Sequence, residues 1–268
     1  MNAVLGYRDA VAAVVRRDLR IFLTYRFRWL SRIVGTLLSL TTFYYVSKLA
    51  RADAVGSHSS YFAFLLVGIV ALPVLTGAMT VAQFVRQELV AGNFERILVS
   101  PTGPVIGILA MLLFPVAFAL LLAAVTLALG VVLFGVHLHL GGIPVTLAVM
   151  ALGCIAFAAI GLLFVATLIA FKSSAAITWV IAGLGLVGGV YFPLSLFPGW
   201  IRWAGSVQPL TPTIDLLRHE LVGASLAHAA WADWVKLTAF AAVLLPVATY
   251  ILSQSIKLSR SQGTILEY

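Results

Sequence analysis

The sequence predicts an all-α integral membrane protein with six transmembrane helices, an N-terminal amphipathic interfacial helix and re-entrant extracytoplasmic helices before the last span. Composition is the first reason: of 268 residues, 62% are hydrophobic and only 10% are charged, and the mean hydropathy is +1.08. A soluble domain carries about 25% charged residues because most of its surface faces water. The second reason is a set of six apolar stretches that contain neither charged residues nor histidine. Both observations indicate that lipid surrounds most of this chain.

The six apolar stretches give the predicted spans in order. They lie at about residues 33–47, 59–85, 103–136, 140–171, 173–201 and 237–256. A helix needs about 20 residues to cross a hydrocarbon core about 30 Å thick. The first stretch is shorter and reaches span length only if residues 29–31 join it, with the side chains of Arg28 and Arg32 extending to the lipid head groups.

A single membrane domain is expected over residues 1–268. It comprises an amphipathic cytoplasmic helix at 1–30, a six-helix bundle at 31–256 and a cytoplasmic tail at 257–268. The 17 lysines and arginines set the orientation, because such residues are enriched in the cytoplasmic segments of membrane proteins. With the N-terminus inside, the basic residues left outside are Lys48, Arg51, Arg202, Arg218 and Lys236. Both termini are therefore predicted to be cytoplasmic.

Residues 1–30 show the pattern of a helix that lies on a membrane surface. In a helical projection, apolar side chains cover one broad arc, and the charged side chains of Asp9, Arg16, Arg17 and Arg20 lie opposite. This pattern fits a basic anchor on anionic lipids. A helix that also rests on a cytoplasmic partner is the alternative.

Several kinds of chemistry lack their residues. No Gly-Lys pair occurs, so the chain has no P-loop to hold nucleotide phosphates. His219 and Glu220 begin an HExxH pattern, but Gly223 stands where the second histidine would be, and Cys154 is the single cysteine. We therefore expect no catalytic residue, no metal site and no cofactor bound by this chain. Its basic residues flank the spans, which indicates membrane lipids and not nucleic acid as their partner.

The predicted spans contain no charged residue and no histidine. Ion-coupled transporters and proton relays place such residues within the membrane, where an ion binds or a proton moves. Channels commonly use charged rings or filter repeats. The sequence disfavours both classes, but sodium sites made of carbonyls and hydroxyls keep secondary transport open. A membrane-embedded enzyme or scaffold would need polar residues clustered within the spans.

The predicted cytoplasmic segment 84–101 reads FVRQELVAGNFERILVSP. Its charged residues alternate with apolar ones, which is typical of a short helical element at the membrane interface. Gly92 and Asn93 should interrupt the helix, and Pro101 should end it. A solvated loop would show the same pattern, and a segment that a soluble partner grips is the functional alternative. The charged candidates for such a contact are Arg86, Glu88, Glu95 and Arg96.

The predicted extracytoplasmic segment 188–223 cannot form one helix because four prolines interrupt it, at positions 193, 198, 209 and 212. Its aromatic residues are typical of a membrane interface. We expect broken helices that dip into the outer leaflet, either as a structural lid or as an exit gate over a translocation path. The gate candidates are Tyr191, Phe192, Pro193, Phe197, Pro198, Trp200, Trp203, Pro209 and Arg218.

Two smaller patterns adjoin that segment. Residues 213–222 predict a short amphipathic helix with Thr213 as its N-cap, and with Asp215, Arg218 and Glu220 on the side that faces water. Upstream, Gly185 and Gly189 form a Gly-x-x-x-Gly pattern, which lets two helices approach closely. This pattern fits intrachain packing and a dimer seam equally.

Three of these segments together resemble a known family. The stretch QELVAGNFERILVSP, followed further along the chain by GGVYFPLSLFPGWIRW and PLTPTIDLLR, is similar to the permease subunit of ABC-2 type transporters, the bacterial ATP-binding cassette exporters. The resemblance extends over about residues 20–268. It implies a multi-pass protein of the bacterial inner (plasma) membrane. It also implies that two permease copies, as a homodimer, bind two copies of a separate ATPase subunit, which holds the ATP and Mg.

The resemblance further implies roles for particular residues. The segment from Glu88 to Pro101 would be the first coupling helix, with Asn93 where the family commonly has Thr, and a second coupling contact would surround Lys172. The characteristic family positions are occupied by Glu88, Gly92, Phe94 and Glu95. ATP-driven motion of the partner would open the pathway outward for an amphipathic or lipid-linked substrate, such as a drug, lipid, polysaccharide or envelope precursor. An ATP-independent secondary transporter or channel is the alternative.

Overall fold

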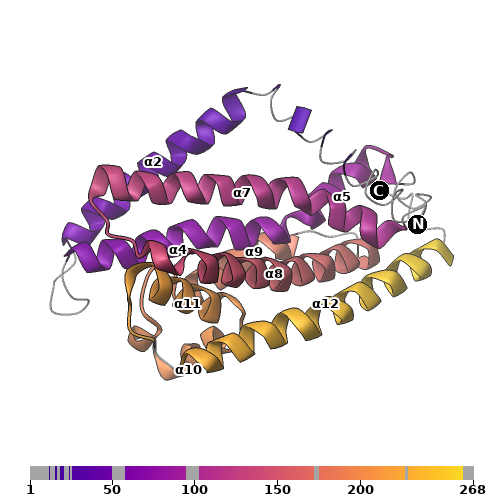
Figure 1. Ribbon diagram of the computed structural model, residues 1–268. Coiled ribbons are helices and arrows are strands. Elements are labelled where there is room, and N and C mark those ends of the chain that lie inside the picture. Colours follow the sequence, from indigo (N-terminus) through magenta and orange to yellow (C-terminus); the bar gives the residue numbers. More distant parts are fainter. Residues whose placement is uncertain are drawn as a thin grey trace.

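The computed structural model describes residues 12, 16, 19–20, 24, 26–49, 58–94, 103–171, 175–226 and 229–261. The interfacial helix predicted at 1–30 and the end of the tail lie almost wholly outside these residues. The regular elements of the described part are all helices (Figure 1). They are α2 (Arg26–Leu49), α4 (His58–Met79), α5 (Val81–Val90), α7 (Pro104–Phe134), η1 (Leu140–Gly142), α8 (Ile143–Phe171), α9 (Ala175–Val187), η2 (Leu194–Leu196), α10 (Gly199–Ser206), α11 (Leu210–Val222) and α12 (Ala230–Ser261).

Four helical stretches of the described chain are long and apolar enough to cross a membrane. They are Tyr61–Val90, Pro104–Phe134, Ile143–Phe171 and Ala230–Ser261. The prediction of an all-helical, multi-pass membrane protein is confirmed at this level. The count of six spans stays a prediction, because α2 carries four basic residues and α9 has only 13 residues, about 20 Å of helix.

The fifth apolar stretch does not continue as one helix. α9 ends at Val187, and Gly189 adopts a φ of 75°, a left-handed conformation that glycine tolerates at the end of a helix. The chain then passes through η2 and α10 to α11. The prolines predicted to break this region do so, since Pro193, Pro198 and Pro209 stand directly before η2, α10 and α11.

Helix α8 lies at the centre of the bundle and contacts α4, α5, α11 and α12. Two glycines allow close packing with the α4–α5 stretch: a Cβ added at Gly153 would lie 2.8 Å from a Leu75 methyl carbon, and one at Gly161 would lie 2.8 Å from the Ala78 carbonyl oxygen. The order of these contacts shows that α4 and α8 run in the same direction. Their first residues therefore lie at one end of the bundle and their last residues at the other.

Two clusters of buried apolar side chains divide the bundle along its length. The α11-end core joins α11 to α4, the first half of α8 and the last part of α7. The α5-end core joins α5 and Phe94 to the first part of α7, the second half of α8 and the last part of α12. Figure 1 shows α5 and α11 at opposite ends of the molecule. The two segments singled out in the sequence are thus anchored in separate cores.

Candidate functional site

Helix α5 continues α4 through Thr80, whose hydroxyl donates a hydrogen bond to the Gly77 carbonyl (2.6 Å). One face of α5 is buried in the α5-end core through Val81, Ala82, Val85 and Leu89. The opposite face borders an open pocket of about 510 Å³, which is lined, among the described residues, by Gln83, Arg86, Gln87, Val90 and Ala91. The predicted helical element is therefore amphipathic, with an uncovered polar face.

The chain turns sharply after α5. Gly92 has a φ of 69°, and the Asn93 N–H donates a hydrogen bond to the Glu88 carbonyl oxygen (2.9 Å). The predicted interruption at these two residues is confirmed. Phe94 follows with only 2% of its surface exposed, packed in the α5-end core. Glu95, Arg96 and Lys172, which complete the predicted coupling set, lie outside the described residues.

The aromatic gate candidates differ widely in burial. Trp200 and Trp203 on α10 are 74% and 64% exposed, and Phe192 is half exposed. Phe197 follows η2 as its C-cap, and its carbonyl accepts a hydrogen bond from Arg202 Nη2 (3.0 Å). Because Trp is favoured at the membrane–water interface, this uncovered edge of α10 is suited to lie there.

Helix α11 corrects two predictions. The helix begins at Leu210, so Thr213 is not its N-cap, and the Thr213 hydroxyl donates a hydrogen bond to the Pro209 carbonyl instead (2.7 Å). Arg218 does not face water, because only 3% of it is exposed. The cause is tertiary: α11 packs against α4, α8 and α12, so most of its circumference is buried.

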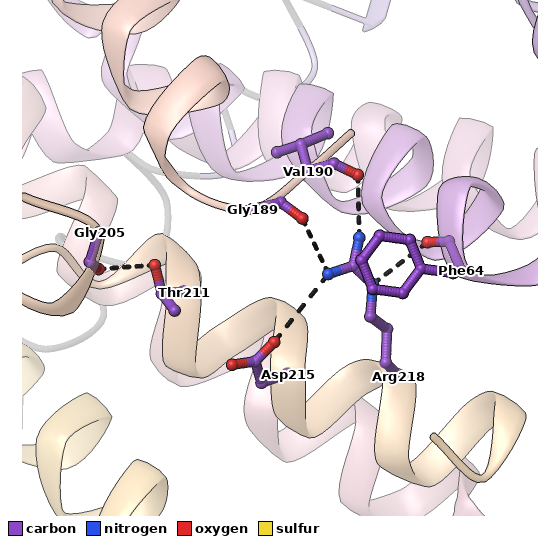
Figure 2. A network of polar contacts seen from close by, with 7 residues as sticks. All are labelled: Phe64, Gly189, Val190, Gly205, Thr211, Asp215 and Arg218. Carbon is purple, nitrogen blue, oxygen red and sulfur yellow. Dashed lines mark hydrogen bonds and ion pairs between the residues drawn. The ribbon is translucent and has the colours of Figure 1, made fainter. Parts of the chain in front are cut away.

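Arg218 joins three segments that are distant in sequence (Figure 2). Its Nε donates to the Phe64 carbonyl on α4 (3.2 Å), and Nη1 and Nη2 donate to the carbonyls of Gly189 and Val190 (2.9 Å each). The guanidinium carbon lies 3.3 Å from the centre of the Phe64 ring. Asp215, one turn earlier on α11, forms an ion pair at 4.0 Å. Arg218 therefore ties α11 to α4 and to the turn after α9.

The charge of Arg218 is only partly compensated. Burial lowers the pKa of its guanidinium from the ordinary value to about 9, and the Asp215 carboxylate opposes this shift. At neutral pH the side chain stays protonated, so all its contacts with carbonyl oxygens are charge-assisted hydrogen bonds.

Tyr191 extends this junction to α2. Its ring stacks on Phe43 with a centroid distance of 5.6 Å, and its carbonyl oxygen accepts a hydrogen bond from the Tyr61 hydroxyl (3.2 Å). Residues 189–191 consequently contact α2, α4 and α11 together. We call this set of contacts, with Arg218 at its centre, the Arg218 junction.

Gly68 belongs to the junction, and nothing in its sequence context indicated a role. A Cβ at this position of α4 would lie 2.5 Å from the Val190 carbonyl oxygen and 3.1 Å from Arg218 Nη2. Of the two glycines singled out in the sequence, Gly185 is buried, and a Cβ there would lie 3.3 Å from Leu72 on α4. Intrachain packing accounts for this contact, and a dimer seam stays a prediction.

Gly68→Ala should lower the free energy of unfolding by about 1–3 kcal/mol, because the added methyl group would displace a backbone carbonyl in a packed region. Gly77→Ala on the same helix is the matched control, since its nearest neighbour would be an ordinary contact at 3.9 Å. The control should raise stability by about 0.5–1 kcal/mol. Thermal unfolding of both variants in detergent checks this, and an equal response would contradict the close approach at Gly68.

The geometry defines a multi-pass α-helical membrane protein with an amphipathic, partly uncovered helix at one end of its bundle and a set of broken, aromatic helices at the other. Within the described residues, no three His, Cys, Asp or Glu side chains come close enough to hold a metal ion. Residues 29–250 match the model of the family described as ABC-2 family transporter protein, and the chain belongs to that family. A search of curated proteins finds no match. The resemblance inferred from the motifs is confirmed, and the chain is a membrane component of an ABC transporter.

Proposed function

We propose that this chain is the permease subunit of an ATP-binding cassette exporter, and that it forms the pathway for an amphipathic or lipid-linked substrate. A separate ATPase subunit, present in two copies, holds ATP and Mg, and a second copy of the permease completes the pathway as a homodimer. The observation that carries the proposal is α5: its inner face is packed in the bundle, and its outer face borders an open pocket. A partner that binds this outer face is thereby linked to the bundle.

The proposed coupling contact comprises Arg86, Glu88, Gly92, Asn93, Phe94, Glu95 and Arg96, with Lys172 at the second contact. Its charged side chains suit a soluble partner because complementary charges guide association and fix register. Phe94 gives the contact its connection to the transport domain, since its ring packs in the core shared with α7, α8 and α12. Motion of the partner would thus reach three long helices through one aromatic ring.

The broken helices at the other end are the proposed extracytoplasmic gate. A Cβ at Gly142 would lie 2.7 Å from the Glu220 carbonyl, and one at Gly153 would lie 3.0 Å from the Thr213 side chain, so α11 runs antiparallel beside the first half of α8. This arrangement supports a re-entrant α11. Together with α2 and α9 as shorter crossings, it fits the six-span topology with both termini in the cytoplasm of a bacterial cell.

The association with an ATPase can be tested directly. The tagged protein is purified from its native membrane in mild detergent, and an equimolar soluble ATPase with vanadate-sensitive ATP hydrolysis is expected to co-purify. Absence of such a partner, together with ATP-independent flux in reconstituted vesicles, would overturn the permease assignment. It would favour the secondary transporter or channel instead.

Replacing Glu88 and Glu95 by Ala should weaken ATPase association about ten-fold and reduce ATP-driven transport, because two charges of the proposed contact are lost. Membrane insertion should be unchanged. Arg202→Ala is the control, since it removes an exposed charge from α10 at the opposite end of the bundle. Normal coupled transport in the double variant would refute the coupling role of this segment.

A further inference from the structure

Gln208 is a buried amide whose hydrogen-bonding groups are both unused within the described chain. Only 6% of the residue is exposed, and neither Nε2 nor Oε1 has a hydrogen-bond partner there. Burying an amide without partners is unfavourable, because its hydrogen bonds to water are lost and not replaced. A binding partner from outside the chain would remove that cost.

The position of Gln208 adds a second source of donors. It lies between α10 and α11, one residue before Pro209, which caps α11 without a side-chain hydrogen bond. The Thr211 hydroxyl already donates to the Gly205 carbonyl (2.6 Å), and Pro212 has no N–H. The backbone N–H groups of Leu210 and Thr211 remain in the first turn, where no earlier helical carbonyl is placed to accept them.

This end of α11 lies inside the bundle. Leu210 is fully buried, and a Cβ at Gly188 on the turn after α9 would collide with its side chain. Thr213 lies against Gly153, in the eleventh position of the 29-residue helix α8. The amide of Gln208 and the start of α11 are therefore surrounded by α8, α9 and α10, and are set back from the Glu220 end of α11.

We propose that Gln208 and the first turn of α11 form a binding point for the oxygen-bearing head group of an amphipathic ligand, a phosphate or a carboxylate. The amide NH₂ and the two N–H groups are donors, and the positive end of the α11 dipole favours an anionic acceptor. Discontinuous helices of membrane transporters use their N-termini toward anionic substrate groups for the same physical reason. The inference rests on the proposed function, because it names a polar contact for the transported substrate.

Dodecyl phosphate is a suitable probe, with dodecyltrimethylammonium as its cationic counterpart and inorganic phosphate as the head group alone. Thermal unfolding of the purified full-length chain is followed in neutral detergent by tryptophan fluorescence. Dodecyl phosphate should raise the midpoint for the natural protein, and the other two probes should not. Gln208→Met keeps the volume but removes the amide, so the concentration of dodecyl phosphate that gives half the shift should rise about ten-fold.

Thr146→Val is the matched control, because the Thr146 hydroxyl on α8 is also buried without a partner. Without probe, both variants should unfold at or above the natural midpoint, since neither loses an intrachain hydrogen bond. An undiminished response in Gln208→Met would overturn the proposal, and so would an equal shift with inorganic phosphate or with the cationic probe. Because this assay contains no ATPase, its failure is distinct from failure of the co-purification that tests the permease assignment.

Discussion

Replacing Arg218 by Met should lower the free energy of unfolding by about 3–5 kcal/mol, the largest loss that we expect from a single polar side chain in this protein. Methionine fills a similar volume but donates no hydrogen bond. The carbonyl oxygens of Phe64, Gly189 and Val190 would then lose the Arg218 donors in a buried region, and each loss costs about 1–3 kcal/mol. Reversible unfolding in mixed micelles measures the loss.

Arg202→Met provides the comparison for this loss. Arg202 is also an arginine whose Nη2 donates to a backbone carbonyl, that of Phe197, but it is exposed. Its replacement should change stability by less than about 0.5 kcal/mol, because water can satisfy the freed carbonyl. Arg218→Lys should fall between the two, since a single ammonium group cannot reach acceptors placed around a planar guanidinium. Equal effects of Arg218→Met and Arg202→Met would refute the central role of the Arg218 junction.

Phe94→Ala should cost about 3–5 kcal/mol, because it empties the space of a buried aromatic ring in the α5-end core. We also expect this variant to retain ATPase binding better than it retains transport, since the exposed face of α5 is unchanged and only its connection to α7, α8 and α12 is weakened. The ratio of transport to ATP hydrolysis, measured in reconstituted vesicles, reports that loss.

Phe171→Ala is the control for the Phe94 variant. Phe171 ends α8 and is 77% exposed, so its loss should stay within about 0.5 kcal/mol and leave the ratio unchanged. If the Phe94 variant lost stability but kept a normal transport ratio, Phe94 would be a packing residue only, and the coupling path would have to run through other contacts.

The long helices could be predicted from the sequence because their cause is local. The apolar stretches at 103–136 and 140–171 correspond closely to α7 and α8, since a lipid-exposed helix must be apolar nearly all around and needs a minimum length. The breaks before α10 and α11 were also predictable, because proline removes a backbone donor wherever it stands. Chain chemistry alone decides these features.

The burial of Arg218 could not be predicted, because its cause is not local. The charges of α11 suggested a side facing water, but three carbonyls from Phe64, Gly189 and Val190 replace that water. Gly68 gave no signal for the same reason, since its small size matters only to a carbonyl more than a hundred residues away. The length of α9 was also hidden, because an apolar sequence continues past Val187 while the helix does not.

Phe64 and the outer face of α5 belong to one helical path, the 30-residue stretch from Tyr61 to Val90, which is about 45 Å long. The Arg218 junction holds this path near its beginning, and the pocket beside Arg86 opens near its end. If the path tilts as a rod by about 10° around its midpoint, each end moves about 4 Å in opposite directions. A displacement of that size exceeds the reach of a hydrogen bond. A push on α5 that opened one end would therefore separate Arg218 from the Phe64 carbonyl at the other, and the protein would open by exchanging one set of contacts for another.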